Sequence, residues 1–335
     1  WALAPGESDG GYAVVSASHK LTTMAVPASM RAVGGDGALR GLETFSQLVT
    51  FHRGDRLYVL ENAPIFVEDA PRFAYRGVMV DVARHWMPIS SLETVVDGMA
   101  FSKLNVLHLH LSDQESWPLE SVAFPDMWES AFSDYEVYTR KELRRFVEYA
   151  RVRGVAVLPE FDSPGHSKSM CRGAPEDVCM STCSTDNWPL RPVNRTLEFL
   201  DDLYHENYGG DDPLFPFSHA HLGGDEVKYD CWDEDNVSST FLTNHNLTSE
   251  QTYLLMLNTN ARRLATTTGK RAIAWDDAYY YFRDDVDTNL VLMFWSNVAD
   301  LMQEATDNGH HVIAAWDMEL YLDYGEDYGR RAYDS

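Results

Sequence analysis

From residue 76 onward, short apolar segments alternate with amphipathic segments seven times. The apolar segments have the length and flanking residues of strands, which are predicted at 76–83, 105–111, 155–161, 218–222, 271–275, 290–295 and 311–316. Helical periodicity fills the segments between them, most clearly at 139–153, where an apolar stripe ends at Gly154. Repeated strand–helix alternation forms a parallel sheet, and seven units favour a closed barrel over an open sheet.

The sequence therefore predicts an α/β fold, in which residues 73–335 form a (β/α)8 TIM barrel whose last unit is absent from this chain. Residues 1–72 differ, because loose alternation is followed by helical spacing at 38–49, which predicts a small α+β domain. An open barrel leaves a parallel edge strand unpaired. We therefore expect the eighth unit to come from another polypeptide or from sequence outside this chain.

Charge and hydropathy exclude two classes of function. The chain has 27 Lys and Arg against 52 Asp and Glu, a formal net charge of -25, whereas nucleic-acid binders usually carry the opposite sign. No segment approaches the roughly 18–20 consecutive apolar residues of a membrane span. We therefore expect neither a nucleic-acid partner nor a membrane span.

The cysteines and glycosylation sequons indicate an oxidising compartment. Zinc spacing is not found among the four cysteines, so we expect two disulfides, pairing Cys171 with Cys179 and Cys183 with Cys231. Three Asn-x-Ser/Thr sequons begin at Asn194, Asn236 and Asn246. Together they predict a secreted or lysosomal/vacuolar glycoprotein.

Carboxylates and tryptophans dominate the carboxyl ends of the predicted strands, where TIM barrels carry their catalytic groups. These residues are Asp81, Arg84, His108, His110, Asp113, Glu160, Asp162, His166, Asp225, Glu226, Trp275, Asp276, Asp277, Trp295, Trp316 and Asp317. No Ser-His-Asp or Cys-His grouping and no Gly-rich phosphate loop stands out. Carboxylates perform acid/base chemistry and indole faces stack on sugar rings, so the combination favours a carbohydrate site without a metal or cofactor.

The sharpest motif is His-Leu-Gly-Gly-Asp-Glu at 221–226. Two adjacent carboxylates repel each other, and with burial this repulsion raises the pKa of one of them. A general acid needs such a retained proton. Gly223 and Gly224 would let the backbone leave the strict pleat that sends neighbouring side chains to opposite faces. A solvated acidic turn, or a carboxylate pair for a metal, is the alternative interpretation.

Several motifs in the same order resemble the family-20 glycoside hydrolases, the β-N-acetylhexosaminidases, from about residue 38 to the end. They are Tyr75-Arg76-Gly77 with Asp81 and Arg84-His85, Asn105-Val-Leu-His-Leu-His-Leu-Ser-Asp113, Pro159-Glu-Phe-Asp-Ser-Pro-Gly-His166, His221-Leu-Gly-Gly-Asp225-Glu226, Trp275 followed by acids, and Tyr321-Leu322-Asp323. Residues 1–72 resemble the C-terminal part of the small domain that precedes the barrel in this family. The family's Trp-x-Glu segment of the eighth strand does not follow Asp323 here.

The resemblance implies an exo-acting enzyme that removes terminal β-linked GlcNAc or GalNAc with retention. In this family the 2-acetamido oxygen of the substrate attacks the anomeric carbon, which gives an oxazolinium intermediate. By resemblance, Glu226 is the acid/base, Asp225 orients the acetamido group and stabilises its nitrogen, and Tyr321 bonds the acetamido oxygen.

The resemblance also assigns residues that bind the substrate or support the acids. Arg76 and Asp323 would hold sugar hydroxyls, and Trp275 and Trp295 would wall the acetamido pocket. Behind the acids, Asp113 and His166 would tune them as a relay. We expect His108 and His110 to be buried strand histidines rather than metal ligands, and Asp276 and Asp277 to be solvated loop acids or N-caps.

Two other functional classes remain open at this point. A non-catalytic, lectin-like barrel could bind the same sugar, although a lectin has no need of Glu226. The chain could also be one part of a processed two-chain hexosaminidase, completed by a second chain that supplies the barrel end. The expected partner is an N-acetylhexosamine-terminated glycan or a chitin oligomer, and a homodimer is a further alternative.

Overall fold

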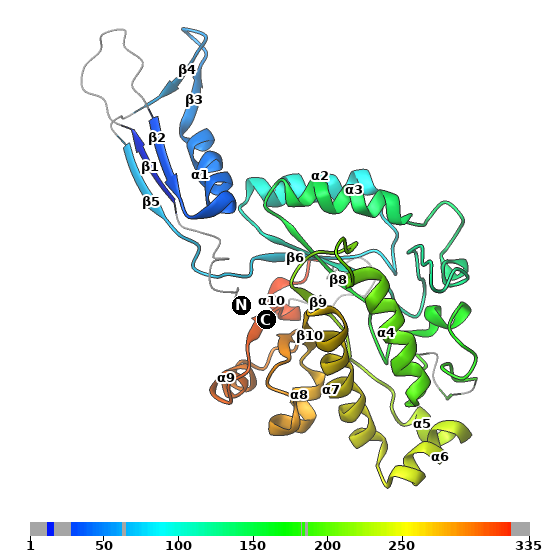
Figure 1. Cartoon of the computed structure of the whole chain (residues 1–335). Helices are drawn as coiled ribbons and strands as arrows, with labels where there is room; N and C mark the ends of the chain where they lie inside the picture. The colour runs from blue at the N-terminus through cyan, green and yellow to red at the C-terminus, as the bar shows by residue number, and fades with distance from the viewer. Residues whose placement is uncertain (1–11, 17–27, 62–64, 182, 185–186, 323–335) are drawn as a thin grey trace, which may run out of the picture. The chain divides into compact units, whose positions relative to one another are not determined.

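A computed structural model describes residues 12–16, 28–61, 65–181, 183–184 and 187–322 (Figure 1). The described part of the chain divides into two compact units. One lies within Trp1–Val78, Ser90–Leu107 and Glu148–Ala156, and the other within Met79–Ile89, His108–Val147 and Val157–Ser335. None of the described helices is long and apolar enough to cross a membrane.

The first unit contains a small antiparallel sheet in the order β2-β1-β5, packed against one long helix. These elements are β1 (Tyr12–Ser16), β2 (Ala28–Ala32), α1 (Gly34–Leu48) and β5 (Ile65–Asp69), with a hairpin of β3 (Val49–His52) and β4 (Leu57–Leu60). Within this unit the buried guanidinium of Arg40, on α1, donates to the carbonyls of Leu104 and Gly154. The α+β character expected from the sequence is confirmed.

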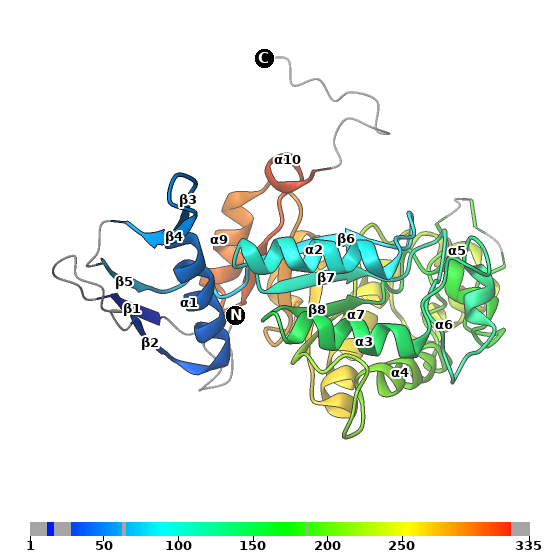
Figure 2. The same cartoon turned by 90° about the horizontal axis from the view of Figure 1, so that it is seen from above.

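A seven-stranded sheet follows, in which each strand lies next to its neighbour in sequence, as Figure 2 shows for β7 and β8. Its strands are β6 (Gly77–Asp81), β7 (Val106–His110), β8 (Ala156–Glu160), β9 (His219–His221), β10 (Arg271–Trp275), β11 (Val291–Phe294) and β12 (Val312–Ala314). The pairs from β8 to β12 are parallel. Each strand falls inside its predicted range, and the curled sheet confirms a partial (β/α)8 barrel.

Helices and short 3-10 turns connect these strands. The α-helices are α2 (Ile89–Phe101), α3 (Arg140–Arg151), α4 (Asn194–Tyr208), α5 (Cys231–Glu234), α6 (Asn236–His245), α7 (Ser249–Thr268), α8 (Asp277–Phe282), α9 (Ala299–Asp307) and α10 (Asp317–Leu320). The 3-10 turns are η1 (Met127–Ser130), η2 (Lys168–Arg172) and η3 (Arg283–Asp285). Thr248 and Gln251 form a capping box that starts α7, and Gly269 ends it in the left-handed conformation. Packing against α4 and β10 then holds α7 in place.

The inner strands of the large sheet, β7 to β11, are buried on both faces, as parallel strands covered by helices usually are. Strand β7 shows how the two faces differ. Because side chains alternate along a strand, Leu107 and Leu109 share one face while His108 and His110 share the other. One face of β7 is therefore aliphatic and the other carries imidazoles, although all four side chains are buried.

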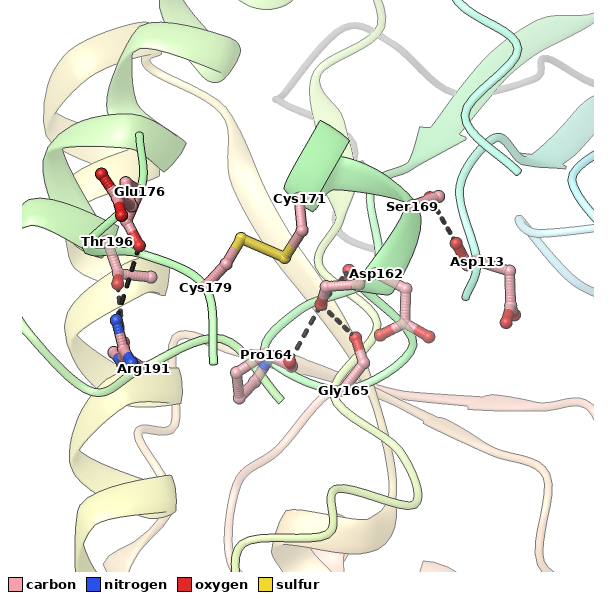
Figure 3. Close-up of a disulfide and its surroundings, with 11 residues drawn as sticks. Asp113, Asp162, Pro164, Gly165, Ser169, Cys171, Glu176, Cys179, Arg191 and Thr196 are labelled. Atoms are coloured by element: carbon pink, nitrogen blue, oxygen red, sulfur yellow. Dashed lines mark hydrogen bonds between the residues drawn. A yellow bond between two sulfur atoms is a disulfide. The ribbon is translucent and has the colours of Figure 1, made fainter. Parts of the chain in front are cut away.

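Two disulfides hold the loops that follow β8 and β9, and they are the pairs predicted from the sequence. They are Cys171–Cys179 and Cys183–Cys231. Figure 3 shows the first of these beside Ser169, which belongs to the same turn, η2, and donates to the carbonyl of Asp113. The disulfide and this hydrogen bond together fix the segment that directly follows His166.

Replacement of Cys183 and Cys231 by serine is expected to lower the free energy of unfolding by about 4 kcal/mol, because the bond closes a loop with a sequence separation of 48. The matched control replaces Cys171 and Cys179, whose separation is 8, and should cost about 2.5 kcal/mol by the same loop-length relation. Denaturant unfolding of both double variants measures the difference. A larger loss for the shorter loop would contradict the expectation.

Candidate functional site

The loop after β9 adopts a backbone conformation that only glycine takes easily. Gly223 and Gly224 have φ values of +70° and +93°, and Glu226 follows with φ +47°. A β-carbon at Gly223 would collide with the carboxyl group of Asp162, while the N–H of Gly224 donates to Asp162 Oδ1 over 2.8 Å. The departure from the pleat expected at these two glycines is therefore present.

This loop brings two carboxylates to one histidine. His166 Nε2 lies 3.8 Å from Asp225 Oδ2 and 3.5 Å from Glu226 Oε2. The His166 side chain is almost fully buried, whereas 52% of the Glu226 side chain and 20% of the Asp225 side chain are exposed. Glu226 is therefore the acid that an external molecule can reach, with a histidine behind it and a more buried acid beside it.

The charges of this group differ from residue to residue. Burial opposes a charge on His166, but its contacts with Asp113 and Glu226 raise its pKa to about 11. The contact with His166 lowers the pKa of Glu226, while burial raises the pKa of Asp225. Of the two adjacent acids, Asp225 is thus the one whose pKa rises.

Asp162 shares in this electrostatic group. Burial and the neighbouring charge of Asp225 raise the pKa of Asp162 well above its ordinary value. Asp162 and Asp225 are therefore two buried acids whose pKa values are both raised, next to the more exposed Glu226.

Asp113 anchors His166 from the far side. Its Oδ1 lies 3.2 Å from His166 Nδ1, and its Oδ2 accepts from Arg84 over 2.6 Å. Arg84 is held in turn by Asp81, 2.7 Å away. Burial opposes the charge of Asp113, yet the hydrogen bonds from His110 and His166 hold its pKa well below the ordinary value.

A second buried carboxylate, Glu160 at the end of β8, lies deeper in the same unit. Its Oε1 accepts from the indole N–H of Trp275 over 2.8 Å, and its Oε2 lies 2.8 Å from His108 Nε2 and 2.9 Å from His110 Nδ1. The ring of His221 packs against those of His108 and Trp275 in tilted orientations, at centroid distances of 4.6 and 4.7 Å. Trp275 is therefore fixed by its indole nitrogen as well as by its ring.

Asp277, at the start of α8, connects Trp295 with the loop at 223–226, which we call the acid loop. It accepts from the backbone N–H of Glu226 over 3.0 Å and from the indole N–H of Trp295 over 2.8 Å. Burial and the charge of Asp225 raise its pKa to about 7. Asp276 beside it is also buried and accepts from the backbone N–H of Trp295.

Arg76, Tyr321 and Asp323 complete the set of predicted site residues. Arg76 directly precedes β6, and its guanidinium donates to the carbonyls of Phe73 and Lys103. Tyr321 follows α10 and is partly exposed. Asp323 lies outside the described residues.

Several residues of this network received no catalytic or binding role from the sequence, among them Arg84, His110, Glu160 and Asp277. Each stands in or next to a motif that the sequence singled out. The available signal was a polar side chain at the end of a mostly apolar strand, as at His110 and Glu160. Asp277 carried no such signal, because a second acid directly after a strand is typical of a solvated loop.

A family model described as "Glycosyl hydrolase family 20, catalytic domain" matches residues 73–334 of the chain. Beta-hexosaminidase 1 of Arabidopsis thaliana is 33% identical over 320 residues, which cover 94% of this chain and 57% of that protein. The human beta-hexosaminidase subunit beta is 34% identical over 307 residues, covering 87% of this chain and 53% of the subunit.

Among solved structures, the chitobiase of Flavobacterium johnsoniae superposes with a TM-score of 0.76 at 28% identity, over 92% of this chain and 46% of that enzyme. The chain spans a little over half the length of the curated relatives it matches. The residues that the family model matches include the loop of Asp225 and Glu226, the histidines of β7, and Trp275 and Trp295. With the similarity to these relatives, this match shows that the chain belongs to glycosyl hydrolase family 20.

Proposed function

We propose that the chain catalyses the removal of terminal β-linked GlcNAc or GalNAc, as an exo-β-N-acetylhexosaminidase. The observation that carries this proposal is the half-exposed Glu226 beside the more buried Asp225, both within 4 Å of His166 Nε2. Relatives named as β-hexosaminidases and a chitobiase support the substrate class.

The proposed reaction is retaining and assisted by the substrate. Glu226 protonates the glycosidic oxygen as the bond to the anomeric carbon breaks, and the acetamido oxygen of the sugar attacks that carbon. Asp225 holds the acetamido N–H and offsets the positive charge of the oxazolinium, while the hydroxyl of Tyr321 donates to the acetamido oxygen. Water, deprotonated by Glu226, then opens the oxazolinium at the anomeric carbon and restores the original configuration.

His166 supplies the proton in this scheme. In the unliganded protein the charges place it on His166, because the pKa of His166 is raised while that of Glu226 is lowered. A bound sugar removes water from Glu226 and so favours its neutral form. The proton then moves from His166 Nε2 to Glu226, across the 3.5 Å that separate the two groups.

The other residues bind the sugar or hold the residues around it in place. Trp275 and Trp295 wall the acetamido pocket, each held by a carboxylate on its indole nitrogen. Arg76 and Asp323 bind sugar hydroxyls, and Asp113 holds His166. No metal or cofactor takes part in this mechanism.

We also propose the domain boundary, the compartment and the natural substrate of the enzyme. A boundary near residue 72 separates the small domain from the catalytic barrel, and the protein works in a secreted or lysosomal/vacuolar compartment, which agrees with its two disulfides. Its natural substrate is an N-acetylhexosamine-terminated glycan or chitin oligomer. A second chain that completes the barrel and a homodimer stay predictions.

Glu226→Gln is expected to lower kcat for an aryl β-N-acetylglucosaminide by about 100-fold or more, because the variant keeps the shape of the side chain but has no proton to give. Initial rates between about pH 4 and 7 measure the change. Glu250→Gln, an exposed acid in the first turn of α7, is the control and should stay within about twofold of the unmodified protein. A protein that binds the sugar but does not hydrolyse it would instead support the lectin-like alternative.

His166→Gln is expected to move the alkaline limb of the kcat/KM profile to lower pH. Without the histidine, whose pKa is about 11, Glu226 must retain the proton alone and loses it at a lower pH. Lys168→Gln is the control, because it removes a cation of the same loop that lies over the ring of Trp188. An unchanged alkaline limb in His166→Gln would show that His166 does not store the proton.

Glycosylation is expected at Asn194, Asn236 and Asn246, which are exposed at the ends of α4 and α6. Enzymatic release of the glycans in heavy-oxygen water converts each occupied asparagine to a labelled aspartate that peptide mass spectrometry detects. Unlabelled asparagine at all three positions, in protein from a eukaryotic secretory host, would contradict this expectation.

A further inference from the structure

The polar interior behind the acid loop needs an explanation that packing does not supply. The inward side chains of a TIM barrel are mostly Val, Ile and Leu, which pack in layers. Here the ends of β7, β8 and β9 instead bring together His108, His110, Glu160 and His221, all at most 3% exposed. Buried charges destabilise a fold unless they are paired, so this group calls for a role beyond filling space.

Among the three histidines described around Glu160, His110 has a distinct position. His221 Nδ1 accepts from the backbone N–H of Gly223 and lies 3.3 Å from Glu160 Oε1. His108 directs Nε2 at Glu160, and burial lowers its pKa to about 4, so it is neutral. Among the described carboxylates, each of these two rings lies at ion-pair distance from Glu160 alone.

Both nitrogens of His110 face carboxylates. Nδ1 lies 2.9 Å from Glu160 Oε2, and Nε2 lies 2.9 Å from Asp113 Oδ2. A neutral imidazole has a single N–H. Its other nitrogen would then face a carboxylate oxygen with only lone pairs between the two atoms. Glu160 also accepts from the indole of Trp275, which can only donate, and this favours an ionised Glu160. The geometry thus favours a doubly protonated His110, with Nε2 hydrogen-bonded to Asp113 and Nδ1 at ion-pair distance from Glu160.

We propose that His110 is a positioning residue for the reaction: as an imidazolium between Glu160 and Asp113, it keeps Asp113 ionised and turned toward His166, so that His166 faces Glu226 as a cation. The inference rests on the proposed function and deepens it. The five side chains then form a line of alternating charge, in the order Glu160, His110, Asp113, His166 and Glu226.

The surroundings of His110 agree with this charge. Burial opposes it, but Glu160 and Asp113 raise the pKa of His110 well above the ordinary value. Several charged or titratable groups act on His110 or on its partner Asp113: Glu160 and Asp162 from β8 and its end, Asp81 from β6, His108 from β7, Arg84, His166 and Asp225. Glu115 acts on Asp113 as well, and Arg84 and His166 are the cations of this group. The net result of these charges is the raised pKa of His110.

The test replaces His110 by glutamine, which removes the charge but keeps a polar side chain. Asp113 then loses a cation, so its pKa rises and it protonates earlier as the pH falls. The acidic limb of kcat/KM should move to higher pH by about one unit or more, the size of a shift caused by one close opposite charge. On the plateau kcat should fall by about tenfold, since His110 acts on Glu226 only through Asp113 and His166, and KM should stay within about twofold.

His108→Gln is the matched control. His108 lies on the same face of the same strand, is equally buried and contacts the same carboxylate, Glu160. It should lower stability as His110→Gln does, but leave the acidic limb where it is in the unmodified protein. An unmoved acidic limb in His110→Gln, or equal shifts in both variants, would assign His110 a structural role and overturn the proposal.

A measurement on the unmodified chain covers the case in which His110→Gln does not fold. Nitrogen-15 spectra of labelled histidine at about pH 8.5 distinguish imidazolium from neutral rings, because exposed histidines with a pKa near 6.5 are then neutral. Two imidazolium rings, His110 and His166, are expected, and fewer than two overturns the proposal. If the unmodified chain hydrolyses no β-N-acetylhexosaminide, the proposed function fails, and these spectra still decide the charge of His110.

Discussion

A carboxylate taken out of water costs several kcal/mol of folding free energy unless cations and hydrogen-bond donors replace the water. Asp113 is completely buried, so its donors determine much of what surrounds it. Arg84, His110 and His166 contact its carboxylate, and Ser169 contacts its carbonyl. One buried negative charge thus connects the segment after β6, the end of β7 and the loop after β8.

The acid loop is positioned by steric exclusion as well as by charge. Asp162 occupies the space that a side chain at residue 223 would need, and it accepts from the N–H of Gly224. On the other side, Asp277 accepts from the N–H of Glu226. Two carboxylates from neighbouring strand ends therefore hydrogen-bond to the loop on either side of Asp225. Glu226, whose backbone N–H donates to one of them, has a left-handed conformation.

Much of this could be predicted from the sequence. Strand–helix periodicity located the seven strands, because apolar segments of strand length contrast strongly with the amphipathic helices between them. The glycine pair before Asp225 could be recognised because few other residues adopt positive φ values. His166 could be placed next to the acids by resemblance, since its motif lies at the end of the preceding strand.

The roles of Glu160, His110 and Asp277 could not be predicted, because they depend on partners far away in sequence. Glu160 and Trp275 are 115 residues apart, and nothing local to either indicates their hydrogen bond. The protonation of His110 likewise follows from two distances that only the fold creates.

The polar interior also determines how the fold responds to acid. Although burial opposes their charges, neighbouring histidines hold the pKa values of Asp113 and Glu160 well below the ordinary range. Stability from such depressed carboxyls is present above their unfolded pKa and disappears only as the pH falls through the folded value. Asp162 and Asp277, whose pKa values are raised, instead become neutral on acidification and stop repelling their neighbours. Mild acid therefore neutralises the unfavourable charges of this interior before the favourable ones. The stabilising contacts of Asp113 and Glu160 consequently persist at mildly acidic pH.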